Sequence, residues 1–337
     1  MKKSDMALEP LRVAVVGLGK MGLLHSSILN VMENVRVVGL CEKSSIVRRI
    51  AKKLLRNVRM VDDVLELSDL DLDAIFVTTP IPTHFSIGKT VFTRNIASNF
   101  FMEKTLAASF SQAQELCKLV QVSRGVNMVG YMKRYSVTFR KAKGLLERKA
   151  IGELTSFQAY AYSSDFAEID LKSKISGSRG GVLPDLGSHV VDLAIWYFGP
   201  LDVASANLHS VTNSSSEDEA AFEVQSSDGL KGLFDVSWCK KEYRMPEFGL
   251  RILGEEGELG VNDDKVDLKL KGGTHTIWYR HDLNDSVGFL IGAPEYYRED
   301  ECFVNSALAG RQVQPDFSEG SKVDKLLEKV KMEAMWK

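Results

Sequence analysis

The sequence lacks any apolar run long enough to cross a bilayer, which takes about 20 residues. Its first ten residues, MKKSDMALEP, carry two lysines with no apolar segment behind them. We therefore expect neither a membrane partner nor a signal peptide. Cysteine is also scarce: the chain has 4, none in a CxxC pair, which argues against a structural zinc site and a disulfide framework. Scattered thiols fit a reducing compartment, so we expect a cytoplasmic protein.

A strong charge of either sign is missing too. Lysine and arginine number 43 against 45 aspartates and glutamates, a formal net charge of -2. This balance gives no electrostatic reason to expect nucleic acid or an anionic membrane surface as a partner. The 337 residues, 44% of them hydrophobic, instead suggest about two globular domains.

The first part of the chain alternates strand-like and helix-like segments. Apolar runs typical of buried parallel strands lie at residues 11–19, 35–42, 72–80, 97–103 and 126–132. Helical patterns between them supply the crossovers that parallel strands need. Residues 1–132 are therefore predicted to form an α/β domain with a doubly wound parallel sheet of the Rossmann type.

From about residue 150 the pattern changes to short strands separated by glycine turns. Hairpins are expected at 220–238, 250–261 and 265–280, with one helix interrupting at 183–198. We predict that residues 133–337 form an α+β domain with a large, mostly antiparallel open sheet. Its C-terminal helix, with helical spacing over residues 321–336, is predicted to pack back on the first domain.

The segment VGLGKMG follows the first predicted strand and precedes a helix. Its Gly17, Gly19 and Gly22 form GxGxxG: the first permits a tight turn, the second lets the backbone approach a pyrophosphate, and the third lets helix and strand pack closely. The helix start, at Lys20 and Met21, then offers N–H groups to the phosphates. The alternative is a glycine-rich turn without a cofactor, but the context of strand, helix and a following acid favours a dinucleotide site.

Glu42 is that acid. It ends the second strand about 20 residues beyond the last glycine, where a carboxylate can hold a ribose 2′-hydroxyl and repels a 2′-phosphate. We therefore expect NAD as the cofactor. Lys43 is expected to contact it as well, and together with Arg48 and Arg49 it leaves NADP open.

The segment TTPIPTHF follows the strand at 72–80, at the sheet edge where ligands bind. Thr79, Pro80 and His84 are therefore candidates for contact with the cofactor, Thr79 and His84 through its ribose. Taken alone, His84 is better explained as a histidine at a helix N-terminus with no special role.

The segment GGVLPDLGSHVVDLAIWYFG carries Asp185 and His189, which share a face on a helix. A carboxylate stacked on an imidazole at a helix N-terminus is a natural proton relay or hydroxyl clamp. Two alternatives stay open: Asp185 as a partner of the helix dipole, or both residues as metal ligands, for which the sequence shows no further ligand motif.

An acid and an amine, Glu103 and Lys104, end the apolar strand at 97–103. One explanation is a salt-bridged strand end, but adjacent residues on a strand point to opposite faces. The other is a catalytic lysine at the carboxyl edge of the sheet, facing the crevice. We favour the catalytic lysine.

Together these motifs resemble one family. GxGxxG, TTP…H, EK and GGxxxDxGxH occur in this order, and the sequence is similar to the glucose-fructose oxidoreductase, inositol 2-dehydrogenase and rhizopine-catabolism (Gfo/Idh/MocA) oxidoreductases. The resemblance covers essentially the whole chain, including GYMKRYSVTFRKAKGLLERKAIGEL between the domains and the closing FVNSALAGRQVQPDFSEG. The joint pattern is specific to the family and not to a substrate.

The resemblance implies an NAD(P)-dependent dehydrogenase that transfers hydride between nicotinamide and a hydroxyl group of a sugar, cyclic polyol or nucleotide sugar. Lys104 would act as the base, while Asp185 and His189 bind the substrate and relay its proton. Glu103 and Lys104 would also contact the nicotinamide ribose, and Lys133 matches a substrate-side position of cyclic-polyol enzymes. The resemblance further implies a homodimer or homotetramer formed through the sheet of the second domain.

The chain departs from the family pattern in three places. Thr105 replaces the usual proline after the lysine, so the loop carrying Lys104 is expected to be set differently. Glu42 stands where aspartate is common, and Ser136 stands where some inositol enzymes carry aspartate.

The family also contains two other functions. One is an NAD-dependent glycosidase, which oxidises, eliminates and reduces in a cycle, and the other is a non-catalytic regulator that senses dinucleotide. The intact lysine, aspartate and histidine argue against the regulator. Two stretches are expected to shape the substrate pocket: residues 165–179 and a loop at 292–300, GAPEYYRED.

Overall fold

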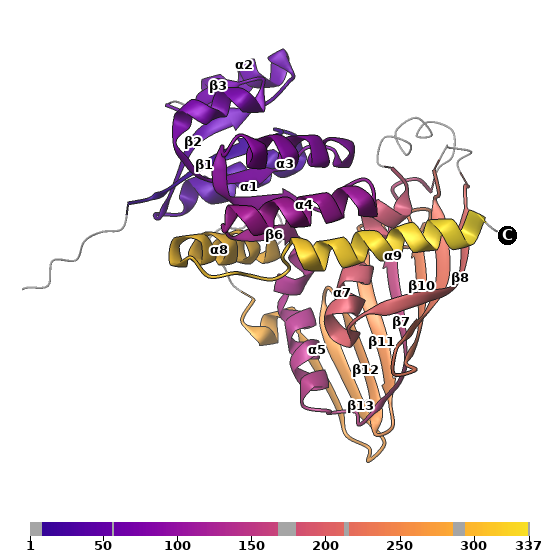
Figure 1. Ribbon diagram of the computed structural model, residues 1–337. Helices are drawn as coiled ribbons and strands as arrows, with labels where there is room; N and C mark the ends of the chain where they lie inside the picture. The colour runs from indigo at the N-terminus through magenta and orange to yellow at the C-terminus, as the bar shows by residue number, and fades with distance from the viewer. Residues whose placement is uncertain (1–8, 56, 168–179, 212–215, 286–293, 336–337) are drawn as a thin grey trace, which may run out of the picture. The chain divides into compact units, whose positions relative to one another are not determined.

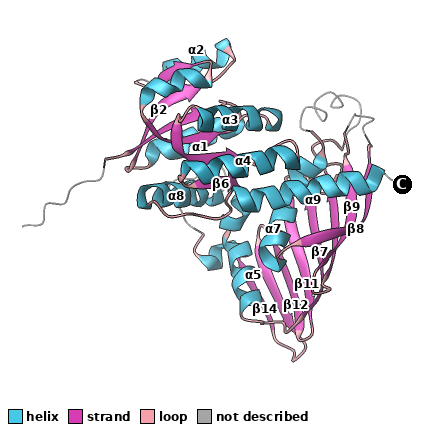
Figure 2. Ribbon diagram, viewed as in Figure 1, coloured by secondary structure: helices cyan, strands magenta, loops and turns pink. Residues whose placement is uncertain are grey.

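The computed structural model describes residues 9–55, 57–167, 180–211, 216–285 and 294–335 (Figure 1). The chain forms two compact units, each with its own sheet (Figure 2). The first unit comprises residues 1–130 and 287–321, and the second comprises residues 131–286 and 322–337. The first break in the chain lies near the predicted one at residue 132, whereas residues 287–321 group with the first unit.

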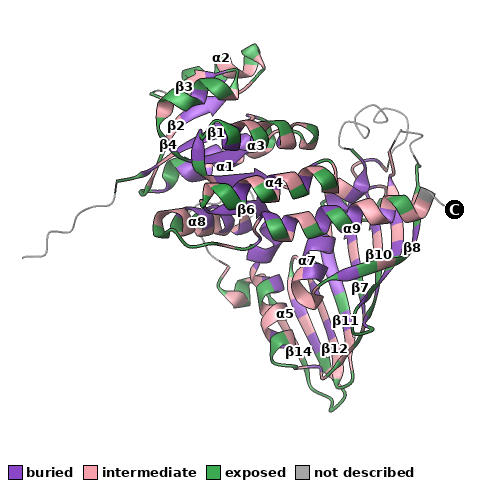
Figure 3. Ribbon diagram, in the orientation of Figure 1, coloured by how far each residue is buried: buried purple, intermediate pink, exposed green. Residues whose placement is uncertain are grey.

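The first unit is built on a six-stranded parallel sheet with the order β3-β2-β1-β4-β5-β6. Its strands are β1 Leu11–Val16, β2 Val35–Cys41, β3 Arg59–Val61, β4 Leu72–Val77, β5 Ala97–Glu103 and β6 Asn127–Gly130. The central strands are buried on both faces (Figure 3), which explains their continuous apolar runs. The strand order reverses between β1 and β4, the position beside which such sheets bind ligands. The predicted doubly wound sheet is confirmed.

Helices cover both faces of this sheet. They are α1 Lys20–Val31, α2 Ser45–Leu54, α3 His84–Thr93, α4 Phe110–Ser123 and α8 Pro294–Ala309, with the 3₁₀ turns η1 Val64–Leu70 and η2 Ile81–Thr83. Two adjacent phenylalanines of β5 point to opposite faces of the sheet. Phe101 stacks on Phe76 of β4 and meets Phe303 of α8, whereas Phe100 stacks on Phe92 of α3. Side chains alternate across the strand, so α8 and α3 pack on opposite sides.

The prediction of a loop over residues 292–300 is wrong, because the chain forms helix α8 from Pro294 onward. The stripe that α8 buries contains Glu295, Glu299 and Asp300 as well as apolar residues. A helix that turns acids inward has no apolar periodicity for a sequence pattern to detect. Of the other predicted pocket stretch, residues 168–179 lie outside the described residues.

The second unit is built on an eight-stranded sheet with the order β14-β13-β12-β11-β7-β10-β9-β8. Its strands are β7 Leu154–Tyr162, β8 Leu201–His209, β9 Glu219–Ser226, β10 Lys231–Ser237, β11 Glu247–Gly254, β12 Gly257–Asn262, β13 Lys265–Leu270 and β14 His275–Tyr279. Every pair is antiparallel except β7 with β10. The mostly antiparallel sheet and its three hairpins are confirmed.

The remaining elements of the second unit are η3 Met132–Tyr135, α5 Val137–Glu147, the π-helical turn η4 Leu183–Gly187, α7 Ser188–Phe198 and η5 Arg280–Leu283. Helix α7 contacts β7 and β11, and α5 contacts β12 and β13. Helix α9, Phe317–Met335, begins within the first unit and continues in the second from residue 322. No helix in the described ranges is both long and apolar enough to cross a membrane.

Candidate active site

The glycine loop between β1 and α1 shows which of its glycines the protein itself requires. Gly17 has φ +92°, and a Cβ there would lie 2.7 Å from Thr79 Cγ2. A Cβ on Gly22 would lie 1.8 Å from the carbonyl oxygen of Gly17. A Cβ on Gly19, in contrast, would meet no described atom within 4 Å. The free space beside Gly19 therefore suits a ligand that approaches the backbone closely.

The N-terminus of α1 borders this free space. Gly19 is the N-cap residue of α1 and has no side chain to accept the first N–H groups, and the first turn contains no acid. The N–H groups of the first turn have no intrahelical acceptor, and the positive end of the helix dipole lies with them. A bare backbone, free N–H groups and a helix N-terminus together fit the pyrophosphate of a dinucleotide.

Glu42 follows β2 and is bonded to the same loop. Its Oε2 accepts the N–H of Leu18 at 2.7 Å, and its Oε1 accepts the N–H of Ser44 at 2.8 Å. The two bonds fix the carboxylate beside the glycine loop. Each oxygen keeps a further lone pair, which can accept a ribose hydroxyl.

Arg48, one of the basic residues that left NADP open, is engaged by the protein. Its Nη1 donates to the carbonyl oxygens of Glu42 at 2.5 Å and Lys43 at 2.8 Å. Its Nη2 pairs with Asp62 at 2.8 Å. The guanidinium is thus held by backbone and carboxylate oxygens, whereas Lys43 and Arg49 are exposed.

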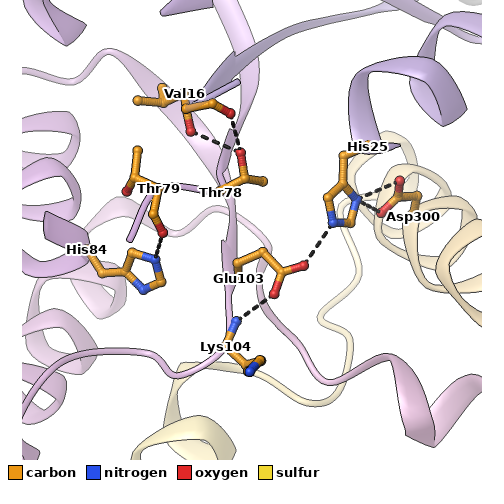
Figure 4. Close-up of polar contacts among 9 residues, drawn as sticks. Val16, His25, Thr78, Thr79, His84, Glu103, Lys104 and Asp300 are labelled. Carbon is orange, nitrogen blue, oxygen red and sulfur yellow. Dashed lines mark hydrogen bonds and ion pairs between the residues drawn. The ribbon is translucent and has the colours of Figure 1, made fainter. Parts of the chain in front are cut away.

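Thr78, Thr79 and His84 connect the end of β4 to its neighbours (Figure 4). The Thr78 hydroxyl lies 2.7 Å from the carbonyl oxygen of Gly17 and so holds the glycine loop. The buried ring of His84 places Nε2 2.7 Å from the carbonyl oxygen of Thr79 and Nδ1 2.8 Å from that of Thr105. His84, predicted to reach the cofactor ribose, thus ties together the two segments that follow β4 and β5.

Burial sets the charge of His84. It lowers the pKa of the ring below its ordinary 6.5, and the two carbonyl oxygens oppose this only in part. A neutral imidazole donates to one carbonyl through its single N–H. The lowered pKa favours the neutral ring at neutral pH, whereas the second carbonyl oxygen favours a proton on both nitrogens.

Glu103 and Lys104 lie where β5 ends, at the carboxyl edge of the sheet. The Glu103 side chain is buried. Its Oε1 lies 3.0 Å from Nε2 of His25, and its Oε2 accepts the backbone N–H of Lys104 at 3.0 Å (Figure 4). The peptide bond between Lys104 and Thr105, where the family usually has proline, is cis.

In the second unit, Asp185 and His189 lie at the junction of the π turn η4 with α7. The predicted single helix thus has two segments, a π-helical turn over Leu183–Gly187 and the α-helix α7. His189 is buried, with its ring centroid 5.1 Å from that of Phe248 and 6.4 Å from that of Tyr131. Aromatic rings thus border the imidazole on two sides.

Lys133 reaches the same aromatic group from η3. Its Nζ lies 4.7 Å from the Phe248 ring centroid and 2.5 Å from Oδ1 of Asp263. The other oxygen of Asp263 accepts the backbone N–H of Phe248 at 3.0 Å. Lys133 and His189, both predicted on the substrate side, therefore meet around one phenylalanine.

A buried ion pair holds η3 against α7. Nε and Nη2 of Arg134 donate to the two carboxylate oxygens of Asp192 at 2.8 and 2.7 Å. This bidentate geometry fixes both the distance and the angle between the two groups. Lys133 precedes Arg134, and His189 lies on the same helix as Asp192, so the pair sets the spacing of the predicted substrate residues.

Two family models match the chain. Residues 11–131 match an oxidoreductase family with an NAD-binding Rossmann fold, and residues 139–260 match the Gfo/Idh/MocA C-terminal domain. The protein belongs to the Gfo/Idh/MocA family. The predictions of an oxidoreductase, of NAD as cofactor and of a nicotinamide-dependent dehydrogenase are thereby confirmed.

Known proteins are similar to this Gfo/Idh/MocA chain along its whole length. Inositol 2-dehydrogenase of Rhizobium meliloti (strain 1021) is 20% identical, and the alignment covers 92% of each chain. D-glucoside 3-dehydrogenase of Escherichia coli (strain K12) is 23% identical over 96% of this chain and 95% of that protein. The solved structure of levoglucosan dehydrogenase in complex with NADH and L-sorbose has a TM-score of 0.87 at 19% identity, covering 98% of each chain, and shares the fold.

Sequence reasoning missed several polar residues of this Gfo/Idh/MocA protein. They are His25, Asp300, Arg134 and Asp192. A weak signal existed for His25, a polar residue inside an otherwise apolar helix start, MGLLHSSIL. The sequence pattern contains no such signal for Asp300, because its hydrogen-bond partner His25 lies 275 positions away along the chain.

Proposed function

We propose that this protein oxidises a secondary hydroxyl group of a sugar, cyclic polyol or nucleotide sugar and transfers the hydride to NAD. Membership of an NAD-binding oxidoreductase family through both domains carries the proposal. Relatives named for inositol and glucoside oxidation support this substrate class.

Lys104 is the proposed base. Oxidation of a carbinol requires loss of the hydroxyl proton, and Lys104 Nζ would take it. When bound, NAD supplies the hydride acceptor, and its positive ring favours a neutral amine nearby. The location of Lys104 directly after β5, at the edge where doubly wound sheets bind ligands, supports this role.

Asp185 and His189 are the proposed substrate clamp and proton relay. The His189 imidazole can accept the proton from the substrate hydroxyl, and Asp185 would orient the ring. Lys133 would bind a further hydroxyl group beside Phe248. That these groups converge with Lys104 around one coenzyme remains part of the proposal.

We propose a preference for NAD over NADP. Glu42 would accept the 2′-hydroxyl of the adenosine ribose, and its charge would repel a 2′-phosphate. The engagement of Arg48 by two carbonyl oxygens and Asp62 supports this preference, because that guanidinium is already neutralised.

The test is NADH formation, followed by absorbance, when the protein is mixed with NAD and a panel of aldoses, inositols, glycosides and nucleotide sugars. We expect absorbance to rise with at least one member. Lys104→Ala should then keep NAD affinity and lose about 10²-fold or more in rate. Lys89→Ala, which removes a half-exposed lysine paired with Glu115, is the control and should behave as the wild type.

Other outcomes of the same assay would overturn the proposal in distinct ways. Cleavage of a chromogenic glycoside without accumulation of NADH would indicate the glycosidase. NAD binding with neither activity would indicate the regulator. Full turnover by Lys104→Ala would place the base elsewhere.

We also propose a homodimer or homotetramer formed through the open face of the second sheet. Helix α7 packs on the face that carries Phe157 and Phe234, where its Phe198 stacks on Phe157. Leu233 points to the opposite face and is 41% exposed. Leu233→Asp should lower the mass measured by light scattering, whereas Val122→Asp on α4 should not. A wild-type monomer would refute the assembly.

A further inference from the structure

In the first unit, a series of buried, hydrogen-bonded polar side chains leads to the end of β5. Nδ1 of His25, on α1, lies 2.8 and 2.9 Å from the two oxygens of Asp300 on α8. Nε2 of His25 lies 3.0 Å from Oε1 of Glu103, and Oε2 of Glu103 accepts the backbone N–H of Lys104. Figure 4 shows this chain of contacts from Asp300 to Lys104.

Each group in this series is shielded from water. His25 and Asp300 are fully buried, and Glu103 is 7% exposed. The His25 ring is bordered by Phe76, Phe101 and Tyr296, at centroid distances of 5.8, 5.1 and 6.1 Å. Buried polar groups in such surroundings are costly unless they are bonded to each other.

The two carboxylates determine which atoms carry hydrogen. Burial by itself lowers the pKa of His25, but Asp300 and Glu103 outweigh it and raise the pKa well above 6.5. Nε2 therefore bears a hydrogen at neutral pH and donates it to Glu103. Two further ionisable groups lie around Glu103: Lys104, which follows it at the end of β5, and buried His84, on whose pKa the charge of Glu103 acts.

The two carboxylate oxygens of Glu103 accept hydrogen bonds from different donors. One accepts from His25 and the other accepts from the Lys104 backbone. A carboxylate bonded at both oxygens cannot rotate without losing one of the bonds. Orientation of the imidazole by Asp300 is thus transmitted to the first backbone atom after β5.

We propose that His25 and Asp300 are positioning residues that hold Glu103, and through it the Lys104 segment, at the carboxyl edge of the sheet. The catalytic consequence rests on the proposed function, in which Lys104 is the base. A displacement of about 1 Å at a reacting group lowers rates by up to about 10²-fold, so such support matters to turnover.

A pair of substitutions tests this chain of contacts. His25→Gln places an amide nitrogen near the position of Nε2 and can still donate to Glu103. His25→Asn is shorter, places its amide nitrogen near Nδ1, and can bond Asp300 but not Glu103. Glu115→Gln, which removes an exposed carboxylate on α4, is the control for a change of charge in the same unit.

The first measurement is hydrogen exchange of the Lys104 amide, followed by NMR on the protein without cofactor or substrate. We expect the fastest exchange in His25→Asn, a smaller rise in His25→Gln, which keeps the bond to Glu103 but loses the one to Asp300, and wild-type exchange in Glu115→Gln. Equal exchange in both His25 variants, whether fast or slow, would refute the proposal, because a packing defect would affect them alike. Since this measurement needs no turnover, it also decides the question if the proposed dehydrogenase activity fails.

The second measurement is turnover with the substrate found for the wild type. We expect kcat to fall about 10-fold or more in His25→Asn with a smaller change in KM, and to fall less in His25→Gln, which keeps the bond to Glu103. In a Glu103→Gln background, His25→Asn should add no further loss, because the two residues act in the same series. Additive losses would contradict transmission through Glu103.

A third variant covers the case in which His25→Asn does not fold. Glu103→Gln keeps the shape of the side chain but has one acceptor oxygen in place of two. It can serve His25 or the Lys104 N–H, not both. Because Asp300 holds the His25 N–H toward that oxygen, His25 should take it and exchange at the Lys104 amide should rise; if exchange stays at the wild-type value, the imidazole does not hold this side chain and the proposal is wrong.

Discussion

Replacing Gly19 by alanine should weaken cofactor binding while leaving the fold intact. Gly19 has φ -70° and ψ -166°, a backbone conformation that alanine adopts without strain. The new Cβ would meet no described protein atom within 4 Å. The cofactor-free variant should therefore be as stable as the wild type, or more stable by about 0.4–1 kcal/mol, because alanine restricts the unfolded chain.

The cost should appear when NAD binds. The Cβ would occupy the space in which we expect the pyrophosphate to approach the N-terminus of α1. Displacing the phosphate from one N–H group loses about 1.5–3 kcal/mol, the value of a hydrogen bond to a charged group. This corresponds to a dissociation constant about 10- to 10²-fold higher.

Thermal unfolding without cofactor and calorimetric titration with NAD measure the two effects separately. Two further glycine-to-alanine variants serve as controls. Gly272→Ala, also in open space, should change neither property. Gly22→Ala would push its Cβ to 1.8 Å from the Gly17 carbonyl oxygen and should destabilise the fold by about 1–3 kcal/mol or more. Undiminished NAD affinity in Gly19→Ala would refute the placement of the pyrophosphate.

Three further predictions follow from the geometry. Glu42→Ala should weaken NAD more than NADP in calorimetric titrations, and equal losses would mean that Glu42 does not contact the 2′ position. Because the pKa of buried His84 is lowered, the unfolded state binds a proton that the folded state does not, so stability should fall as pH drops from about 6.5 toward the lowered pKa, by at most about 1.4 kcal/mol per pH unit. Denaturant unfolding of His84→Gln should lose this slope, and an unchanged slope would contradict a neutral ring. Asp192→Ala removes the carboxylate that buried Arg134 bonds and should cost about 3–5 kcal/mol in denaturant unfolding. Glu258→Ala, which breaks the more exposed pair with Arg251, should cost about 1 kcal/mol or less. Similar losses in the two variants would contradict a stabilising role of the buried pair.

Much of the first unit could be predicted from local patterns. A strand buried on both faces is apolar at every position, as Val13–Val16 and Phe100–Met102 are, so a continuous apolar run bounded by turn residues locates it. The short strand β3, with 3 residues, has too few positions for a pattern and escaped prediction. Helix α8 escaped for a different reason: it buries acids, which a hydrophobic pattern assigns to solvent.

In the candidate site, too, some residues could be predicted from local patterns and others could not. Gly17, Gly22 and Glu42 could be assigned in advance because a tight turn and a strand end restrict the residue types they accept. The role of His84 could not, since its two carbonyl partners, on Thr79 and Thr105, become neighbours only when the sheet forms.

By itself the sequence determined the two-part architecture, the dinucleotide loop and the candidate residues Lys104, Asp185 and His189, because each depends on residues close together in the chain. Only the tertiary structure decided what surrounds them: His25 and Asp300 behind Glu103, and Phe248 between Lys133 and His189. The physical reason is distance along the chain. A buried hydrogen bond between residues 275 positions apart leaves no local pattern, and it forms only where folding excludes water from both partners.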